Sequence, residues 1–198
     1  MLDGRLRLDA SVYYYNYKDL QAVVPSPTGS FLVDNVGEVD SWGLESSIQW
    51  LINENLDVYA SGAWTDSEVT EAQALCGGLD DCEGNSLPGV PDFSWSLVAD
   101  AHFPASADQW VARAELFGQS DVNGGLQALP ESEIDAYAEV ALRAGYRSDN
   151  GWSAIAYVEN LTDEEYHFVA IPGAGILPAR FLGTSRPRTA GIRLSWEM

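Results

Sequence analysis

The 198-residue sequence predicts an all-β fold, a transmembrane antiparallel meander β-barrel of about eight strands. Three observations predict this fold. Apolar and polar residues alternate with a period of two along most of the chain, the connections between these segments alternate between short and long, and aromatic residues recur at both ends of the apolar faces. Transmembrane barrels combine these properties because each strand turns one face to lipid and the other to the lumen.

Eight segments alternate in this way, and each has one face without charged residues. In the first half of the chain these apolar faces are Leu6, Leu8, Ala10, Val12 and Tyr14; Trp42, Leu44, Ile48 and Trp50; Leu56, Val58, Ala60, Gly62 and Trp64; and Phe93, Trp95, Leu97, Ala99, Ala101 and Phe103. In the second half they are Trp110, Ala112, Ala114 and Leu116; Ile134, Ala136, Ala138, Val140, Leu142, Ala144 and Tyr146; Trp152, Ala154, Ala156 and Val158; and Ala190, Ile192, Leu194 and Trp196. A soluble β-sandwich also alternates, so this pattern alone does not decide the fold.

The connections between the predicted strands have two lengths. The short turns are 51–55, 104–109 and 147–151. The long connections, which are rich in Gly, Pro, Asp and Ser, are 20–37, 66–92, 120–133 and 161–188. Short periplasmic turns and long extracellular loops are the asymmetry of outer-membrane barrels.

Aromatic residues mark both ends of the predicted apolar band. Those near the short turns or the chain end are Trp50, Phe103, Trp110, Tyr146, Trp152 and Trp196, and those near the long loops are Trp42, Trp64 and Trp95. The spacing from Trp42 to Trp50 corresponds to roughly 26 Å along a strand. With a strand tilt of about 40° it projects to roughly 20 Å, near the height of the apolar band between two aromatic girdles.

Composition excludes some functions. The formal net charge is −20, and no nucleic-acid partner is expected because such binding depends on Lys and Arg that neutralise phosphates. The acidity has two interpretations: it provides solubility, or the long acidic loops hold divalent cations or repel anions. No apolar run is long enough for a transmembrane helix.

The two cysteines, Cys76 and Cys82, enclose a loop rich in Gly and Asp. No His and no second cysteine pair lies nearby, so a structural zinc site is not expected, and no metal site is predicted. In an oxidising compartment the pair is best explained as a small loop-closing disulfide. Residues 1–10 lack the apolar core of a signal peptide, so either the protein is not exported or the chain lacks its true N-terminus.

Four stretches, in chain order, resemble motifs of TonB-dependent outer-membrane receptors. NVGEVDSWGLESSIQW (35–50) is similar to a strand late in the receptor barrel with the pattern Gly-x-Glu, here Gly43 and Glu45. NSLPGVPDFSWSL (85–97) resembles a loop-to-strand entry. YVENLTDEEY (157–166) resembles the end of the penultimate strand, through Asn160, Leu161 and Tyr166, and GTSRPRTAGIRLSW (183–196), with Arg188, resembles the last strand.

This resemblance implies that residues 1–198 are the C-terminal slice of a 22-stranded barrel, without the plug domain and the signal peptide. It implies location in the outer membrane of a Gram-negative bacterium and contact with outer-membrane lipid and lipopolysaccharide. The parent receptor would use TonB, which acts through the missing plug, for energised uptake of a bulky nutrient such as a ferric siderophore. No cofactor is implied, and the fragment is expected to be inactive alone. The chain departs from the family by ending in Glu197 and Met198 instead of an aromatic residue.

The resemblance places ligand contacts on the long extracellular loops. The candidates are His167, as a ligand contact or a haem ligand, and Arg180 and Arg186, because a guanidinium suits an anionic siderophore. Arg180, Arg186 and Arg188 also suit the phosphates of lipopolysaccharide. For the lone His a solvated side chain is the simpler explanation, and for the arginines ordinary ion pairing is.

Two other functions fit parts of the sequence. A complete eight-stranded barrel would have its interior filled by side chains and would act as a structural or surface-binding module. An outer-membrane hydrolase could use Asp100 and His102, but this spacing does not build a triad and no G-x-S-x-G motif is present. The protein is therefore not expected to be an enzyme.

The stretch NLTDEEY (160–166) permits three local structures. It is formally an N-glycosylation sequon, a capping box that opens a helix at Thr162 and Glu165, or the exit of a β-strand. A bacterial barrel favours the third. In that structure Asn160 and Thr162 bond nearby backbone where the strand ladder ends, and Tyr166 returns to the barrel wall.

Overall fold

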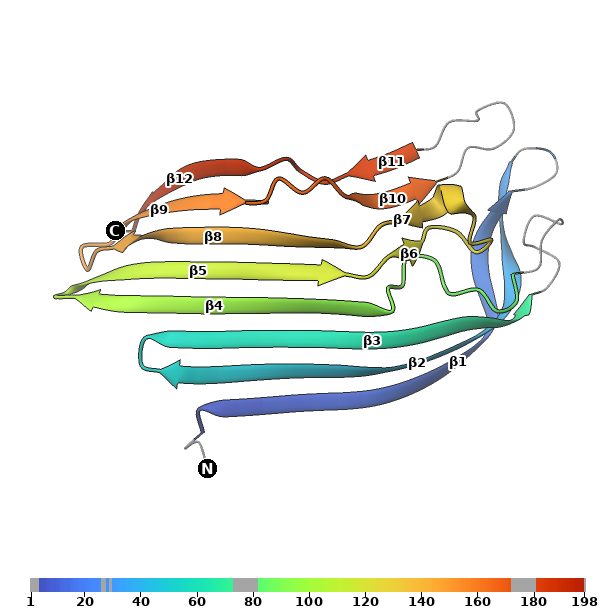
Figure 1. Cartoon of the computed structure of the whole chain (residues 1–198), viewed down its shortest axis with the longest axis horizontal. Coiled ribbons are helices and arrows are strands. Elements are labelled where there is room, and N and C mark those ends of the chain that lie inside the picture. Colours follow the sequence, from blue (N-terminus) through green and yellow to red (C-terminus); the bar gives the residue numbers. More distant parts are fainter. Residues whose placement is uncertain (1–3, 26–27, 29, 73–81, 172–180, 198) are drawn as a thin grey trace.

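The computed structural model describes residues 4–25, 28, 30–72, 82–171 and 181–197. Its main element is an antiparallel sheet in which successive strands of the chain lie side by side (Figure 1). The strands are β1 (Leu6–Pro25), β2 (Phe31–Asn53), β3 (Leu56–Ala72), β4 (Phe93–Ala105), β5 (Asp108–Gln119), β8 (Tyr137–Arg147), β9 (Trp152–Glu159) and β12 (Thr189–Trp196). The predicted eight strands and their order are confirmed.

The first hairpin is longer than the sequence predicts. Residues 20–37 were expected to form a loop, but β1 continues to Pro25 and pairs there with the start of β2 at Phe31. The ladder is irregular between Tyr17 and Leu20, and Asp19 has a φ of 55°. A bulge shifts the side-chain alternation by one residue. The pairing therefore continues past Tyr17, although the period-two signal stops there.

The two last long connections also contain structure that the sequence prediction missed. The connection between β5 and β8 contains β6 (Val122–Asn123), a short 3₁₀ helix η1 (Pro130–Ser132) and β7 (Glu133–Ile134). The connection between β9 and β12 contains β10 (His167–Ile171) and β11 (Phe181–Thr184). The prediction that one strand runs from Ile134 is wrong, since Ile134 belongs to β7 and β8 begins at Tyr137. Ile134 instead packs with Val122 and Ala170 in a small buried cluster.

The two faces of the sheet differ as predicted. Residues that lie directly opposite each other on paired strands share a face, and the apolar face is exposed along its length: Leu8 is 63% exposed, Val12 75% and Ile192 71%. Aromatic contacts occur at both ends of this face. Trp42 and Trp64 meet with ring centroids 4.7 Å apart near the long connections, and Trp110 and Tyr146 meet at 4.9 Å near the short turns.

The sheet is open, with β1 at one edge and β12 at the other. The short turns and both ends of the chain lie at one end of the sheet, and β6, β7, β10 and β11 lie at the opposite end (Figure 1). In the part of the chain that the structure describes, no helix has the length and apolarity needed to cross a membrane.

Candidate functional site on the polar face and its rim

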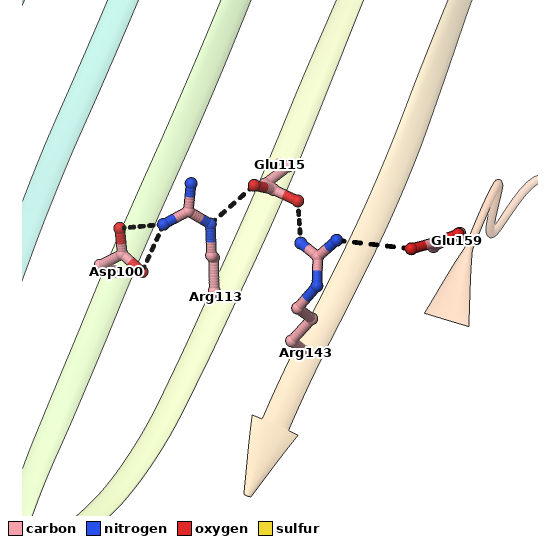
Figure 2. A network of polar contacts seen from close by, with 5 residues as sticks. All are labelled: Asp100, Arg113, Glu115, Arg143 and Glu159. Atoms are coloured by element: carbon pink, nitrogen blue, oxygen red, sulfur yellow. Dashed lines mark hydrogen bonds and ion pairs between the residues drawn. The ribbon is translucent and has the colours of Figure 1, made fainter. Parts of the chain in front are cut away.

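Five charged side chains form a ladder across the polar face of the sheet (Figure 2). The register sets Asp100 of β4, Arg113 of β5 and Arg143 of β8 in one cross-strand row. Glu115 of β5 lies between the two arginines, and Glu159 of β9 completes the ladder. Cross-strand neighbours on one face are close enough to pair, so the ladder follows from the register and the alternation.

Charges alternate along this ladder. Arg113 contacts Asp100 at 3.0 Å and Glu115 at 2.7 Å, and Arg143 contacts the other oxygen of Glu115 and lies 3.5 Å from Glu159. Each arginine thus lies between two carboxylates. About a third to nearly half of each guanidinium-bearing side chain is exposed, with Arg143 at 34% and Arg113 at 42%. Solvent screening therefore limits the contribution of each pair, and the network contributes more than any single pair.

Replacing Arg143 with methionine is expected to lower the free energy of unfolding by about 1–2 kcal/mol. The substitution keeps the apolar stem but leaves Glu159 and one oxygen of Glu115 without their cation. Arg147→Met is the matched control, because Arg147 lies on the same strand and forms no ion pair with the described residues. Urea unfolding in micelles, with each variant placed in a closed barrel that contains these strands, would measure both losses. Equal losses would contradict a stabilising role for the ladder.

A hollow of about 810 Å³ lies on the polar face beside the ladder. Its floor consists largely of small residues, including Ser61 and Ser96, whose hydroxyl oxygens lie 2.8 Å apart. Glu45, one of the motif residues, lines its edge and is exposed. The polar face can thus receive another polar surface or a polar solute over several strands.

Gly43, the motif residue two positions before Glu45, permits a close cross-strand contact. Tyr13 of β1 lies directly opposite Gly43, and its hydroxyl group is 2.8 Å from the Thr65 hydroxyl of β3. The Tyr13 ring therefore crosses over Gly43 to reach the second strand away. A Cβ on Gly43 would lie 2.7 Å from the Tyr13 hydroxyl oxygen and would overlap the Trp64 carbonyl oxygen. Only glycine leaves room for this ring.

Asn160 lies at the end of β9 and joins two parts of the chain. It is 1% exposed and adopts a left-handed backbone conformation with a φ of 49°. Its Nδ2 donates to the Glu164 carbonyl at 2.8 Å and to the Arg186 carbonyl at 2.9 Å, while its Oδ1 accepts from the Glu164 amide at 2.8 Å. The strand-exit interpretation of NLTDEEY is thus supported, and the segment forms a turn instead of a helix.

The two C-terminal motifs contact each other at this corner. Asp163 accepts a hydrogen bond from the Arg188 amide at 2.7 Å, and the Arg188 guanidinium donates to the Leu161 carbonyl at 3.3 Å. Ser185 adds two bonds, since its hydroxyl accepts from the Tyr166 amide at 3.1 Å and donates to the Glu164 carbonyl at 3.2 Å. The base of the connection between β9 and β12 is therefore closed.

Tyr166 anchors this connection to the polar face of the sheet. Its ring stacks on Tyr137 of β8 with centroids 3.8 Å apart, and its hydroxyl donates to Glu139 at 2.8 Å. Burial and this hydrogen bond raise the pKa of Tyr166 to about 12. The predicted return of Tyr166 to the barrel wall is thus refined, because the ring lies on the polar face near the rim, which is the end of the sheet at the long connections.

The structure brings two of the three proposed ligand contacts to this rim. His167 begins β10 and pairs with Thr184, and the exposed Arg186 lies beside Asn160 through its backbone carbonyl. Arg180 lies outside the described residues, as does Cys76. Cys82 is fully buried and disulfide-bonded, and its pairing with Cys76 remains a prediction. Over the described residues, no group of three or more His, Cys, Asp or Glu side chains is placed to hold a metal ion.

Sequence reasoning identified Asn160, Tyr166 and Arg188 but missed their partners. Asp163, Ser185 and Glu139 complete the corner, and a loop sequence offers little to distinguish them from solvated polar residues. The signal that was available is the Asn and Asp spacing within NLTDEEY, since these residue types adopt left-handed conformations most readily.

Asp100, a candidate residue for a hydrolase, is bound by Arg113.

Comparison with known proteins identifies the family. The TonB-dependent receptor-like β-barrel family model matches residues 1–161, and the chain belongs to this family. It is an outer-membrane β-barrel protein. The metal-pseudopaline receptor CntO of Pseudomonas aeruginosa strain UCBPP-PA14 is 25% identical over 199 residues, which are 99% of this chain and 26% of that receptor. The chain thus spans about a quarter of the length of the curated relatives it matches.

Solved structures share the fold. The ferric yersiniabactin uptake receptor FyuA of Yersinia pestis matches with a TM-score of 0.79 and 18% identity, over 96% of this chain and 27% of that one. The siderophore receptor PiuA of Acinetobacter baumannii matches with a TM-score of 0.73 and 21% identity, over 98% and 26%. The copper transporter OprC matches with a TM-score of 0.72 and 17% identity, over 98% and 29%. The predicted fold class and family are confirmed.

Proposed function

We propose that the chain forms the last eight strands of a larger receptor barrel, whose activity is TonB-energised uptake of a metal complex with a small chelator. The open sheet carries this proposal. One face is apolar between two rows of aromatic residues and the other is polar, and among the described residues the edge strands β1 and β12 each have a partner on one side only. Further strands of the same barrel would pair with β1 and β12. Residues 1–198 then contain neither the plug domain nor the segment that contacts TonB.

The free edges support the view that the chain is inactive alone. Backbone groups in the hydrocarbon layer need hydrogen-bond partners within the protein, because lipid provides none. An open sheet of eight strands leaves the outer backbone groups of β1 and β12 unsatisfied at membrane depth. Neither a closed pore nor a complete ligand site forms from this sheet by itself. The parent receptor passes its ligand without changing it chemically, so the chain is not an enzyme.

The ligand class is inferred from the relatives and from the rim. The relatives are named as receptors for metal–pseudopaline, ferric yersiniabactin and other siderophores. Each of these ligands combines a metal with a small organic chelator. His167 and Arg186 lie at the rim opposite the short turns, where a ligand arriving from outside would first meet the barrel. The same rim would lie next to lipopolysaccharide.

A folding experiment tests the fragment proposal. The isolated chain, refolded in detergent micelles, is expected to give no band of altered mobility on unheated SDS gels and no protease-resistant core. A chimera that joins the chain to the plug and preceding strands of FyuA should give both signs of a closed barrel. A heat-modifiable, protease-resistant isolated chain would instead establish the alternative, a complete eight-stranded barrel with a structural or surface-binding role.

A further inference from the structure

We propose that the three long connections after β3, β5 and β9 form one mechanical unit, here called the collar, comprising residues 82–92, 120–134 and 160–188 where the structure describes them. In this unit Asn85 and Gly124 are positioning residues for His167 and Arg186. The positioning role rests on the proposed receptor function, whereas the collar itself does not.

The first connection is joined to the second by hydrogen bonds. The Gly89 amide donates to the Asn123 carbonyl at 2.8 Å, and Asn85 Nδ2 donates to the Leu126 carbonyl at 3.0 Å. The first connection is also fixed to the sheet, because the Val69 amide donates to the Asn85 carbonyl at 2.9 Å. A displacement of residues 120–134 therefore acts directly on residues 82–92.

The second connection is joined to the third by packing. Val122 and Ile134 from the second connection bury Ala170 of β10, which is 2% exposed. Gly124 lies at the closest approach: a Cβ there would lie 2.5 Å from the Ala170 carbonyl oxygen and 2.8 Å from the Ser132 carbonyl oxygen. Both neighbours are backbone atoms, so an added methyl group must move one of the two segments.

The third connection carries the proposed ligand contacts. His167 lies on β10, three residues before Ala170, and Arg186 follows β11 at the base closed by Asn160. The second connection holds Ala170 by packing, and the side chain of Asn160 holds the turn after β9 by hydrogen bonds. The segment between them, which carries His167, is therefore fixed at both ends. The positions of both side chains then depend on Gly124 and Asn85, neither of which needs to touch the ligand.

Hydrogen exchange with mass spectrometry on the whole receptor tests this coupling. Gly124→Ala is expected to speed exchange by about tenfold in residues 82–92, 167–171 and 181–185 as well as in 120–134. Gly125→Ala is the matched control, since a Cβ at Gly125 meets, among the described residues, only the Ser132 side chain, at 3.8 and 3.9 Å. Asn85→Asp, which removes the donor to Leu126, should speed exchange in the first two connections. Faster exchange confined to 120–134 in Gly124→Ala would overturn the collar.

Binding of ferric yersiniabactin and metal–pseudopaline to the same variants separates the collar from the proposed function. Weaker binding by Gly124→Ala but not by Gly125→Ala is expected for whichever probe binds the parent receptor. If exchange is coupled and no metal complex binds, the proposed function fails and the collar stands. If a complex binds equally well to both variants, the positioning role is wrong.

Discussion

Asn160→Ala is expected to open the base of the connection between β9 and β12, lowering the local free energy of opening by about 4 kcal/mol. The side chain satisfies two backbone carbonyls and one amide, and it is almost fully buried. Each lost bond costs about 1 kcal/mol, and an alanine in the left-handed conformation costs roughly 1 kcal/mol more. Since about 1.4 kcal/mol corresponds to a factor of ten, opening should increase about a thousandfold.

Hydrogen exchange at the amides of Leu161, Glu164 and Arg188 would measure this opening, because all three are donors at the corner. Two further variants separate the contributions. Asn160→Gly loses the bonds but adopts the backbone conformation freely, so it should fall short of alanine by about 1 kcal/mol. Asn160→Asp keeps the acceptor but turns a carboxylate toward two carbonyl groups. An effect of Asn160→Ala no larger than that of Leu161→Ala, which changes an exposed neighbour, would refute the role of the corner.

The strands of the sheet could be predicted because lipid and lumen impose opposite chemistry on alternate residues. Leu44 and Glu45 are adjacent and must face opposite ways, so the sequence of each strand predicts which of its side chains face lipid and which face the lumen. This constraint ends where the membrane ends. Beyond Tyr17 the bulge at Asp19 shifts the alternation, and the remaining pairing of β1 with β2 depends on backbone hydrogen bonds that any side chain permits.

The site could be predicted only in part, because its contacts join motifs that lie far apart in the chain. Asn160 and Arg188 each stand out within their own motif. The sequence around either residue does not predict that the side-chain amide of Asn160 donates to the Arg186 carbonyl. The ion ladder is different. The alternation with Ala112 and Ala114, and with Leu142 and Ala144, predicts that Arg113 and Arg143 share the inner face. Their order along the ladder, however, depends on the register between β5 and β8.

The rim and the polar face differ in how they resist change. The ladder consists of partly exposed ion pairs, which water and salt can replace, so single substitutions there should have moderate effects. The corner at Asn160 and the crossing at Gly43 depend on buried backbone groups and on close contact, for which no solvent substitute exists. Gly43, Asn160 and Arg188, which the sequence resemblance singles out, lie at these two less tolerant places.

Gly43→Ala is expected to destabilise the sheet by about 1–3 kcal/mol, the usual cost of overpacking. The added methyl group overlaps the Trp64 carbonyl oxygen and presses on the Tyr13 ring. Tyr13 must then leave its bond to Thr65, or β2 must move away from β3. Neither change is local, because both neighbouring strands pair with β2 along most of its length.

Gly62→Ala supplies the control, and the sign of its effect should be opposite. Gly62 lies on β3 beside β2, but a Cβ there meets its nearest atoms at 3.7 and 3.8 Å, which is ordinary contact. Removing the backbone freedom of a strand glycine should stabilise the protein by about 0.5–1 kcal/mol. Urea unfolding in micelles, with both substitutions made in the chimera with the plug and preceding strands of FyuA, gives both values. Tyr13→Ala combined with Gly43→Ala should recover only part of the loss, because the overlap with the Trp64 carbonyl remains. Full recovery would assign the whole effect to the tyrosine ring. An unchanged stability in Gly43→Ala alone would show that the close crossing is not required.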